Sequence, residues 1–92
     1  MIKSFRHKGL RALYEQGSTR GVQQNHASKL RRILTNLDVA ESPEDMDLPG
    51  YKLHELQGNR GGIWSVKVNG NWRVTWRFEG KDVEIVNYED YH

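Results

Sequence analysis

The chain ends in a run of side chains that could carry out acid–base chemistry, Asn87-Tyr88-Glu89-Asp90-Tyr91-His92. A histidine titrates near neutral pH and can act as a general acid or base, and a tyrosine ring can stack on a nucleobase. Terminal residues are usually frayed, but this tail follows directly on a stretch that alternates like a β-strand, so a sheet edge could hold it. A disordered polar tail is the alternative interpretation.

His54 and Arg73 lie upstream and could complete a site for RNA cleavage. That reaction needs a base for the 2′-OH proton, an acid for the leaving 5′ oxygen and a cation for the charge of the transition state. His54, Arg73, Asp90 and His92 could supply these groups if the fold brings them together. Since the reaction needs no metal, we expect a metal-independent enzyme without a cofactor.

Other catalytic patterns have little support. A metal site made of His54, Asp90 and His92 is conceivable, but the chain has no tight ligand motif such as His-Glu-x-x-His. The Gly-rich stretch 58–62 has the wrong spacing for a phosphate-binding loop. Without cysteine or a Gly-x-Ser-x-Gly motif, covalent hydrolase chemistry is not indicated.

Length and composition predict one small domain covering residues 1–92, with a modest core because only 36% of the residues are hydrophobic. The absence of cysteine fits a reducing compartment. No apolar run approaches the length of a membrane span, and the first residues are polar, unlike a signal peptide. We therefore expect a cytoplasmic protein that does not enter a membrane.

The net charge of +2 conceals an uneven distribution. Residues 1–35 contain eight lysines and arginines against one acid, residues 36–50 contain five acids and no base, and the remainder contains six of each. A basic half suits a polyanionic partner, although two helices with solvated outer faces would look the same.

Two amphipathic helices are predicted in the first half. Apolar residues at positions 10, 13 and 14 lead to a glycine C-cap at Gly17, and positions 27, 30, 33, 34 and 37 form a longer apolar stripe. Ile2–Phe5 is expected to be extended, and His7 and His26 to lie at the surface. The acidic segment 41–50 is expected to be a loop with at most one short turn.

From Tyr51 onward the apolar period changes to two, which predicts strands. Runs cover 51–54, 64–68, 72–78 and 83–88, where Val83 and Ile85 alternate with Glu84 and Val86. Hairpins are expected at Asn69-Gly70 and at 79–81. The fold class is therefore α+β, with two N-terminal helices packed on a small, mainly antiparallel sheet.

If one face of this sheet packs on the helices, the other is polar and rich in cations. It would present Lys52, His54, Lys67, Arg73, Thr75 and Arg77. Arginine forks match phosphate geometry, so the face could bind RNA. An ordinary solvated sheet face explains the same residues.

The segment YKLHELQGNRGGIWSVKVNGNWRVTWRF, the ending NYEDYH and the opening MIKSFRHKGLRALYEQG together resemble the RelE/HigB superfamily of type II toxins, with HigB the nearest group. The resemblance runs along nearly the whole chain. It implies the RelE-like fold and a toxin that cuts mRNA in the ribosomal A site, by 2′-OH attack that leaves a 2′,3′-cyclic phosphate, and so inhibits translation and growth. It also implies a cognate HigA-like helix-turn-helix antitoxin, with the 70S ribosome and mRNA as the other partners.

The resemblance also assigns roles to residues. The catalytic positions would be His54, Arg73, Asp90, Tyr91 and His92. His54 and His92 would be the candidates for general acid and general base, and Asp90 would act as a base or orient one of them. Arg73 would stabilise the phosphate, and Tyr91 would position the tail or stack on RNA. Binding of RNA and ribosome would use Lys52, Arg60, Lys67 and Arg77.

One departure from the family pattern concerns Gln57, where relatives can carry a lysine that neutralises phosphate. Lys52, Arg60 or Lys67 could compensate, or the toxin is a mild one. Three other functions fit the sequence less well. These are a ParE-like gyrase inhibitor, which would not need the His54/Asp90/His92 set, a non-catalytic RNA-binding module and a plain protein-interaction domain.

Overall fold

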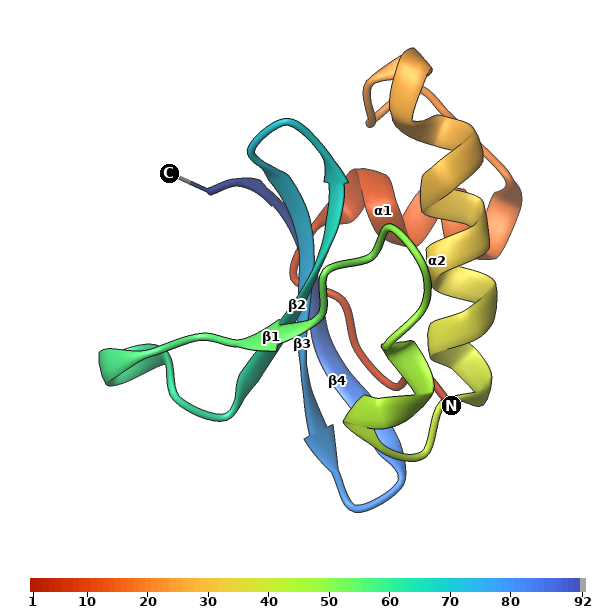
Figure 1. Ribbon diagram of the computed structural model, residues 1–92. Coiled ribbons are helices and arrows are strands. Elements are labelled where there is room, and N and C mark those ends of the chain that lie inside the picture. Colours follow the sequence, from red (N-terminus) through yellow and green to blue (C-terminus); the bar gives the residue numbers. More distant parts are fainter. Residues whose placement is uncertain (92) are drawn as a thin grey trace.

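The computed structural model describes residues 1–91. Two helices cover one face of a four-stranded antiparallel sheet with the strand order β1-β2-β3-β4 (Figure 1). The helices are α1 (Lys8–Gln16) and α2 (Ala27–Val39), and the strands are β1 (His54–Glu55), β2 (Ile63–Asn69), β3 (Trp72–Glu79) and β4 (Asp82–Asp90). Short 3₁₀ turns lie at η1 (Gln24–His26), η2 (Pro43–Met46) and η3 (Gly58–Arg60). The predicted α+β class and both predicted hairpins are confirmed.

Helix α1 is capped at both ends, by His7 at its N-terminus and by Gly17 at its C-terminus. The His7 side chain is its N-cap and accepts a hydrogen bond from the backbone N–H of Leu10 at 3.0 Å. Gly17 ends the helix at φ 71°, a left-handed conformation that suits glycine at this position. The predicted C-cap is therefore confirmed.

The core lies between the helices and the covered face of the sheet. From α2 it takes the predicted stripe, and Leu30, Ile33 and Leu37 are fully buried. Val74 and Trp76 of β3 are fully buried against this layer. None of the helices within residues 1–91 combines the length and apolar character needed to cross a membrane.

The N-terminal segment is extended, as expected, and lies along the free edge of β4. Ile2 bridges Val83 and Phe5 bridges Val86, both in parallel orientation. Backbone N–H groups of Lys3 and Arg6 donate to the carbonyls of Val83 and Val86 at 2.7 and 2.8 Å. The first and last parts of the chain are therefore joined in one sheet.

The alternation predicted for β4 is wrong at one position. A β-bulge opposite Trp76 shifts the register, and Ile85 adopts φ 52°. Val83 and Val86 are the buried pair, whereas Ile85 is only partly buried. The cause is the extra residue of the bulge, which reverses the inside-outside order that a strict period of two assumes.

Two further expectations are corrected. The strand predicted at 51–54 is reduced to His54–Glu55, because Lys52 adopts φ 48° and interrupts the extended run. His26 is buried at 3% exposure instead of lying at the surface, and its Nδ1 is 2.6 Å from the Tyr88 hydroxyl. A polar partner on the facing strand makes that burial tolerable, and the helical period could not reveal it.

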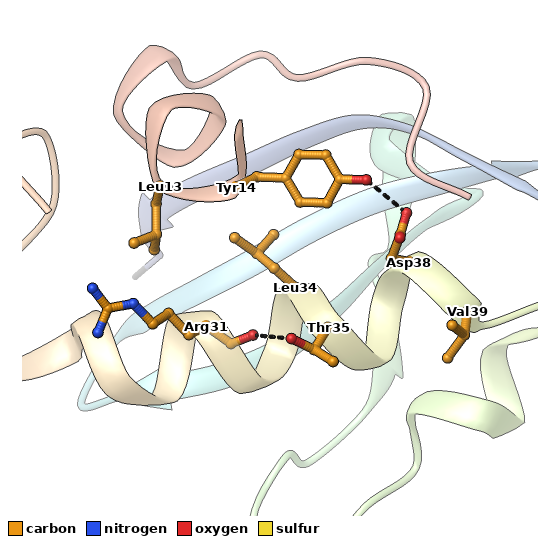
Figure 2. A pocket seen from close by; sticks show the side chains of 7 residues that line it. All are labelled: Leu13, Tyr14, Arg31, Leu34, Thr35, Asp38 and Val39. Atoms are coloured by element: carbon orange, nitrogen blue, oxygen red, sulfur yellow. Dashed lines mark hydrogen bonds between the residues drawn. The ribbon is translucent and has the colours of Figure 1, made fainter. Parts of the chain in front are cut away.

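A groove of about 380 Å³ runs between the two helices on the covered side of the sheet (Figure 2). Asp38 joins three parts of the chain there, since its Oδ1 accepts from the Tyr14 hydroxyl at 2.8 Å and from the Ile2 N–H at 3.0 Å. The Ile2 N–H is the main cause of the lowered pKa of Asp38. Residues of α1 and α2 line this groove, so it lies on the other side of the sheet from the polar face described next.

Candidate active site on the open face of the sheet

The sheet face that the helices leave uncovered carries the predicted polar side chains. The strand register places Ser65, Thr75 and Asn87 in one row across β2, β3 and β4, and Lys67, Arg73 and Glu89 in the next row. Their neighbours along the strands, such as Val66, Val74 and Tyr88, are buried in the core. The predicted face is therefore present, with Glu89 and Asn87 added to it.

Arg73 is the best-anchored cation of this open face. Its Nε donates to the Ser65 hydroxyl at 2.8 Å, and its Nη2 donates to the Lys52 carbonyl at 2.9 Å. The same Nη2 lies 3.1 Å from His54 Nδ1. Burial lowers the pKa of Arg73, but a guanidinium stays charged in proteins. The result is a fixed positive charge with its orientation determined by three partners.

The contact with Arg73 also fixes the tautomer of His54. A guanidinium has donors only, so Nδ1 of His54 must be the acceptor, and the neutral ring then carries its proton on Nε2. Pairing of His54 with Ser65 in the β1–β2 ladder sets the ring position. The turn at Lys52 supplies the carbonyl that completes the clamp on Arg73.

The tail is held at the sheet edge. Asp90 pairs with Trp72 in the β3–β4 register, and the Tyr91 N–H donates to the Asn71 carbonyl at 2.8 Å. The Arg60 guanidinium lies over the Tyr91 ring, 6.0 Å from its centroid. His92, the remaining predicted catalytic residue, lies outside the described residues.

Glu89 is a polar hub that the sequence reasoning missed. Its carboxylate accepts two hydrogen bonds from Arg60 at 2.8 and 3.1 Å, and further bonds from Thr75 and Asn87. These donors, Arg60 first, lower the pKa of Glu89 despite its partial burial. The sequence did contain a signal for it, because a residue next to the buried Tyr88 in an alternating strand lies on the opposite, open face.

The predicted residues divide into two groups. His54 and Arg73 are in contact at one end of the open face, and Lys52 and Lys67 border them, while Tyr91 is tied to Asn71 and lies under Arg60. Arg77 lies four residues farther along β3, about 13 Å from Arg73 by strand geometry, and is paired with Glu84. Arg60 is committed to Glu89. Within residues 1–91, no three His, Asp or Glu side chains are grouped as metal ligands.

Comparison with known proteins places this chain in a family. Residues 3–92 match the sequence model of a family described as the RelE-like toxin of the type II toxin–antitoxin system HigB. The chain belongs to this HigB-like toxin family. As a type II toxin, it has an antitoxin as partner and an RNA target connected with translation.

Two curated relatives match this HigB-like toxin along essentially their whole lengths. It is 46% identical over 92 residues to Endoribonuclease HigB of Proteus vulgaris, covering all of both chains. It is 30% identical over 94 residues to Toxin HigB-1 of Vibrio cholerae, covering 100% of this chain and 98% of that one.

Solved structures share the fold. YafQ from E. coli superposes with a TM-score of 0.57 at 18% identity, and a histidine-to-glutamine mutant of YafQ superposes with 0.58 at 20% identity. In both cases the match covers 98% of this chain and 91% of the other. At this identity the likeness supports the RelE-like fold of the HigB-like toxin and nothing finer.

Proposed function

We propose that this toxin is a ribosome-dependent endoribonuclease that cleaves mRNA in the A site without a metal, and that residues 1–92 act as one toxin domain. The observation that carries the proposal is the clamped Arg73 beside His54, at the sheet edge where the tail is tied. The name of the Proteus vulgaris relative, an endoribonuclease, supports it.

The chemistry follows from these groups. A base removes the proton of the 2′-OH, the 2′ oxygen attacks the adjacent phosphorus, and the 5′ oxygen leaves as it is protonated, giving a 2′,3′-cyclic phosphate and a 5′-OH end. His54, Asp90 and His92 divide the roles of acid and base. Arg73 stabilises the charge on the phosphate oxygens, and Tyr91 positions the tail or stacks on a base.

The rest of the open face binds the RNA and the ribosome. Lys52 and Lys67 border the reacting phosphate, and Arg60 and Arg77, which are paired with Glu89 and Glu84, lie farther along the sheet. We further propose that the antitoxin is HigA-like, with a helix-turn-helix, and that the toxin acts in the cytoplasm on 70S ribosomes.

The test is toe-printing of a defined mRNA on programmed ribosomes. Arg73→Ala is expected to lower the cleavage rate by about 10²–10³-fold, since it removes a donor to the transition-state charge. His54→Ala and a variant lacking His92 should also lose cleavage. Arg32→Ala is the control, because Arg32 is an exposed cation on α2 that bonds Ser28. All variants should remain folded at the temperature of the assay, which thermal melts check.

The outcomes separate the possible functions. An A-site cut made only by the wild type and the control, and absent on free RNA, establishes the nuclease. Cleavage that survives Arg73→Ala overturns the assigned site. No cut by any variant, combined with a DNA-damage response on expression, would indicate gyrase inhibition instead.

A further inference from the structure

A pocket on the open face is not used by the chemistry above. It has a volume of about 210 Å³ and lies farther along the sheet from Arg73, on the Thr75 row, where the η3 turn, the N-terminal segment and the β4 bulge meet. Ile63 and Ile85 contribute apolar walls, and Asn59 and Asn87 contribute amides. A second hollow adjoins it and shares Arg6, Arg60 and Asn87.

The bulge that builds this pocket is strained. A β-branched residue at φ 52° is a conformational outlier, because its side chain disfavours the left-handed region. The N-terminal segment holds it there, since the Ser4 hydroxyl accepts from the Ile85 N–H at 2.8 Å and the Ser4 carbonyl accepts from the Val86 N–H at 3.1 Å. The bulge places the Ile85 side chain in the pocket wall instead of the core.

The polar groups of the pocket have unused hydrogen-bonding capacity. Arg6 is exposed, and its guanidinium makes no hydrogen bond or ion pair with the described residues, and the same holds for the Asn59 amide. Asn87 gives one N–H to Glu89 and keeps its carbonyl oxygen as an acceptor. By contrast, Arg60 donates from both terminal nitrogens, Nη1 and Nη2, to Glu89. The pocket therefore offers one available cation, amide donors and acceptors, and two apolar walls.

We propose that this pocket binds an unpaired nucleotide of the RNA substrate next to the cleaved one, and so helps to set the sequence preference of the toxin. The base would lie against Ile63 and Ile85 with its edge bonded to Asn59 and Asn87, and its phosphate would bind Arg6. Apolar contact on the ring face and hydrogen bonds on the edge are how proteins read single-stranded RNA.

The position of the pocket fits this role, which rests on the proposed nuclease function. Thr75 lines the pocket and lies two residues from Arg73 on the same strand face, a separation of about 7 Å. Arg60 connects the two areas, since it lines the pocket and also covers the Tyr91 ring. One extended RNA strand can therefore occupy both.

The experiment is cleavage of an mRNA library randomised at the positions flanking a fixed cut, on programmed ribosomes, with sequencing of the new 5′ ends. Asn59→Ala is expected to flatten the preference at one neighbouring position by about tenfold. Arg6→Ala should raise KM on all sequences alike and weaken the salt dependence, with kcat changed less than about twofold. The matched controls are Asn25→Ala and Lys3→Ala, which are exposed and do not line the pocket.

Ile85→Gly is a second variant that relieves the backbone strain while removing a wall of the pocket. It should melt no lower than an Ile63→Ala variant and still lose sequence preference. If the wild type cleaves, and Asn59→Ala, Arg6→Ala and Ile85→Gly all keep its preference and KM, the subsite is overturned while the nuclease stands. If the wild type does not cleave at all, the proposed function itself fails.

Discussion

At the level of single residues, Gln57 is neutral at a position where a lysine would add a positive charge, and its substitution shows whether that charge affects cleavage. Its side chain is exposed and makes a single long contact, 3.4 Å, to the Glu55 carbonyl. Gln57→Lys adds a cation three residues after His54, where relatives of the resembled family can carry one, so we expect faster cleavage and stronger growth arrest, by about tenfold.

The control for this change is Gln57→Glu, which keeps the length and reverses the charge. It should slow cleavage, because it repels the phosphate. The measurement is the single-turnover rate on programmed ribosomes together with growth under graded induction. Equal rates for the wild type and both variants would show that this position does not act on the phosphate.

Glu89 predicts a pH dependence of stability. Its pKa is lowered from 4.5 in the folded protein, chiefly by hydrogen bonds from Arg60. A lowered folded pKa stabilises the fold above the unfolded pKa, and that stability is lost as the pH falls through the folded value. Glu89→Gln should therefore cost about 1 kcal/mol at pH 7 for this part-buried pair, and the difference should vanish in the acid range below pH 4.5.

Urea unfolding of both proteins at several pH values measures this difference. Glu84→Gln is the matched control, because Glu84 forms a more exposed pair with Arg77 and should show a smaller change. A Glu89→Gln deficit that persists unchanged in acid would mean that packing, not ionisation, explains the loss.

At the level of elements, Gly9 and Gly21 allow the start of α1 to touch the loop that follows it. A Cβ built on Gly9 would lie 2.3 Å from the Gly21 carbonyl oxygen, which is backbone and cannot move aside cheaply. Gly9→Ala should therefore destabilise the fold by about 1–3 kcal/mol, the usual cost of overpacking.

Gly61→Ala is the control for that variant. Its φ is −57°, and its new Cβ would meet its nearest neighbour at 3.4 Å, an ordinary contact. It should be neutral or slightly stabilising, because alanine restricts the unfolded chain. Thermal melts of the two variants measure the difference, and equal melting temperatures would contradict the close approach.

Trp76 connects the element scale to the core. It is fully buried on β3 directly along the strand from Thr75, which belongs to the open face. Trp76→Ala should cost about 3–5 kcal/mol of unfolding free energy, whereas Arg73→Ala removes hydrogen bonds to Ser65 and to the Lys52 carbonyl and should cost less, about 1–2 kcal/mol. Denaturant titration of both would show whether β3 separates core from site; a stable Trp76→Ala protein would refute that division.

Much of the fold was predictable from local rules. The apolar stripes indicated both helices, and Asn69-Gly70 indicated the central hairpin, because these signals depend on neighbours in sequence. The bulge at Ile85 depends on the N-terminal segment, and the turn at Lys52 depends on its contact with Arg73. The burial of His26 depends on Tyr88. Each of these partners is distant in sequence. No local period contains that information.

The same division holds for the candidate site. The period of two placed Arg73 and Thr75 together on the open face, and the structure adds the contact between Arg73 and His54. The period of two could not show that Glu89 pairs with Arg60, since that pair depends on how the η3 turn folds over the sheet. The sequence therefore predicted Arg60 as an unpaired cation, whereas it forms an ion pair with Glu89.

At the level of the whole molecule, the two ends of the chain serve different purposes. The tail is tied beside Arg73 and emerges on the sheet side, whereas Met1 lies on the helix side near Asp82 (Figure 1). We therefore expect a tag fused after His92 to abolish cleavage without lowering the melting temperature. The same tag fused before Met1 should leave the cleavage rate largely intact. Equal activity of both fusions would show that the tail is not part of the site.

The pairing of residues 2–6 with residues 83–86 has a consequence for how the toxin is made. β4 lies between β3 and the N-terminal segment, so the sheet cannot close until residues 83–86 have left the exit tunnel of the translating ribosome. A contact that spans nearly the full chain is also slow to form. We therefore expect each newly made molecule to stay inactive until residues 83–86 have emerged, because the sheet that carries the open face is completed only then.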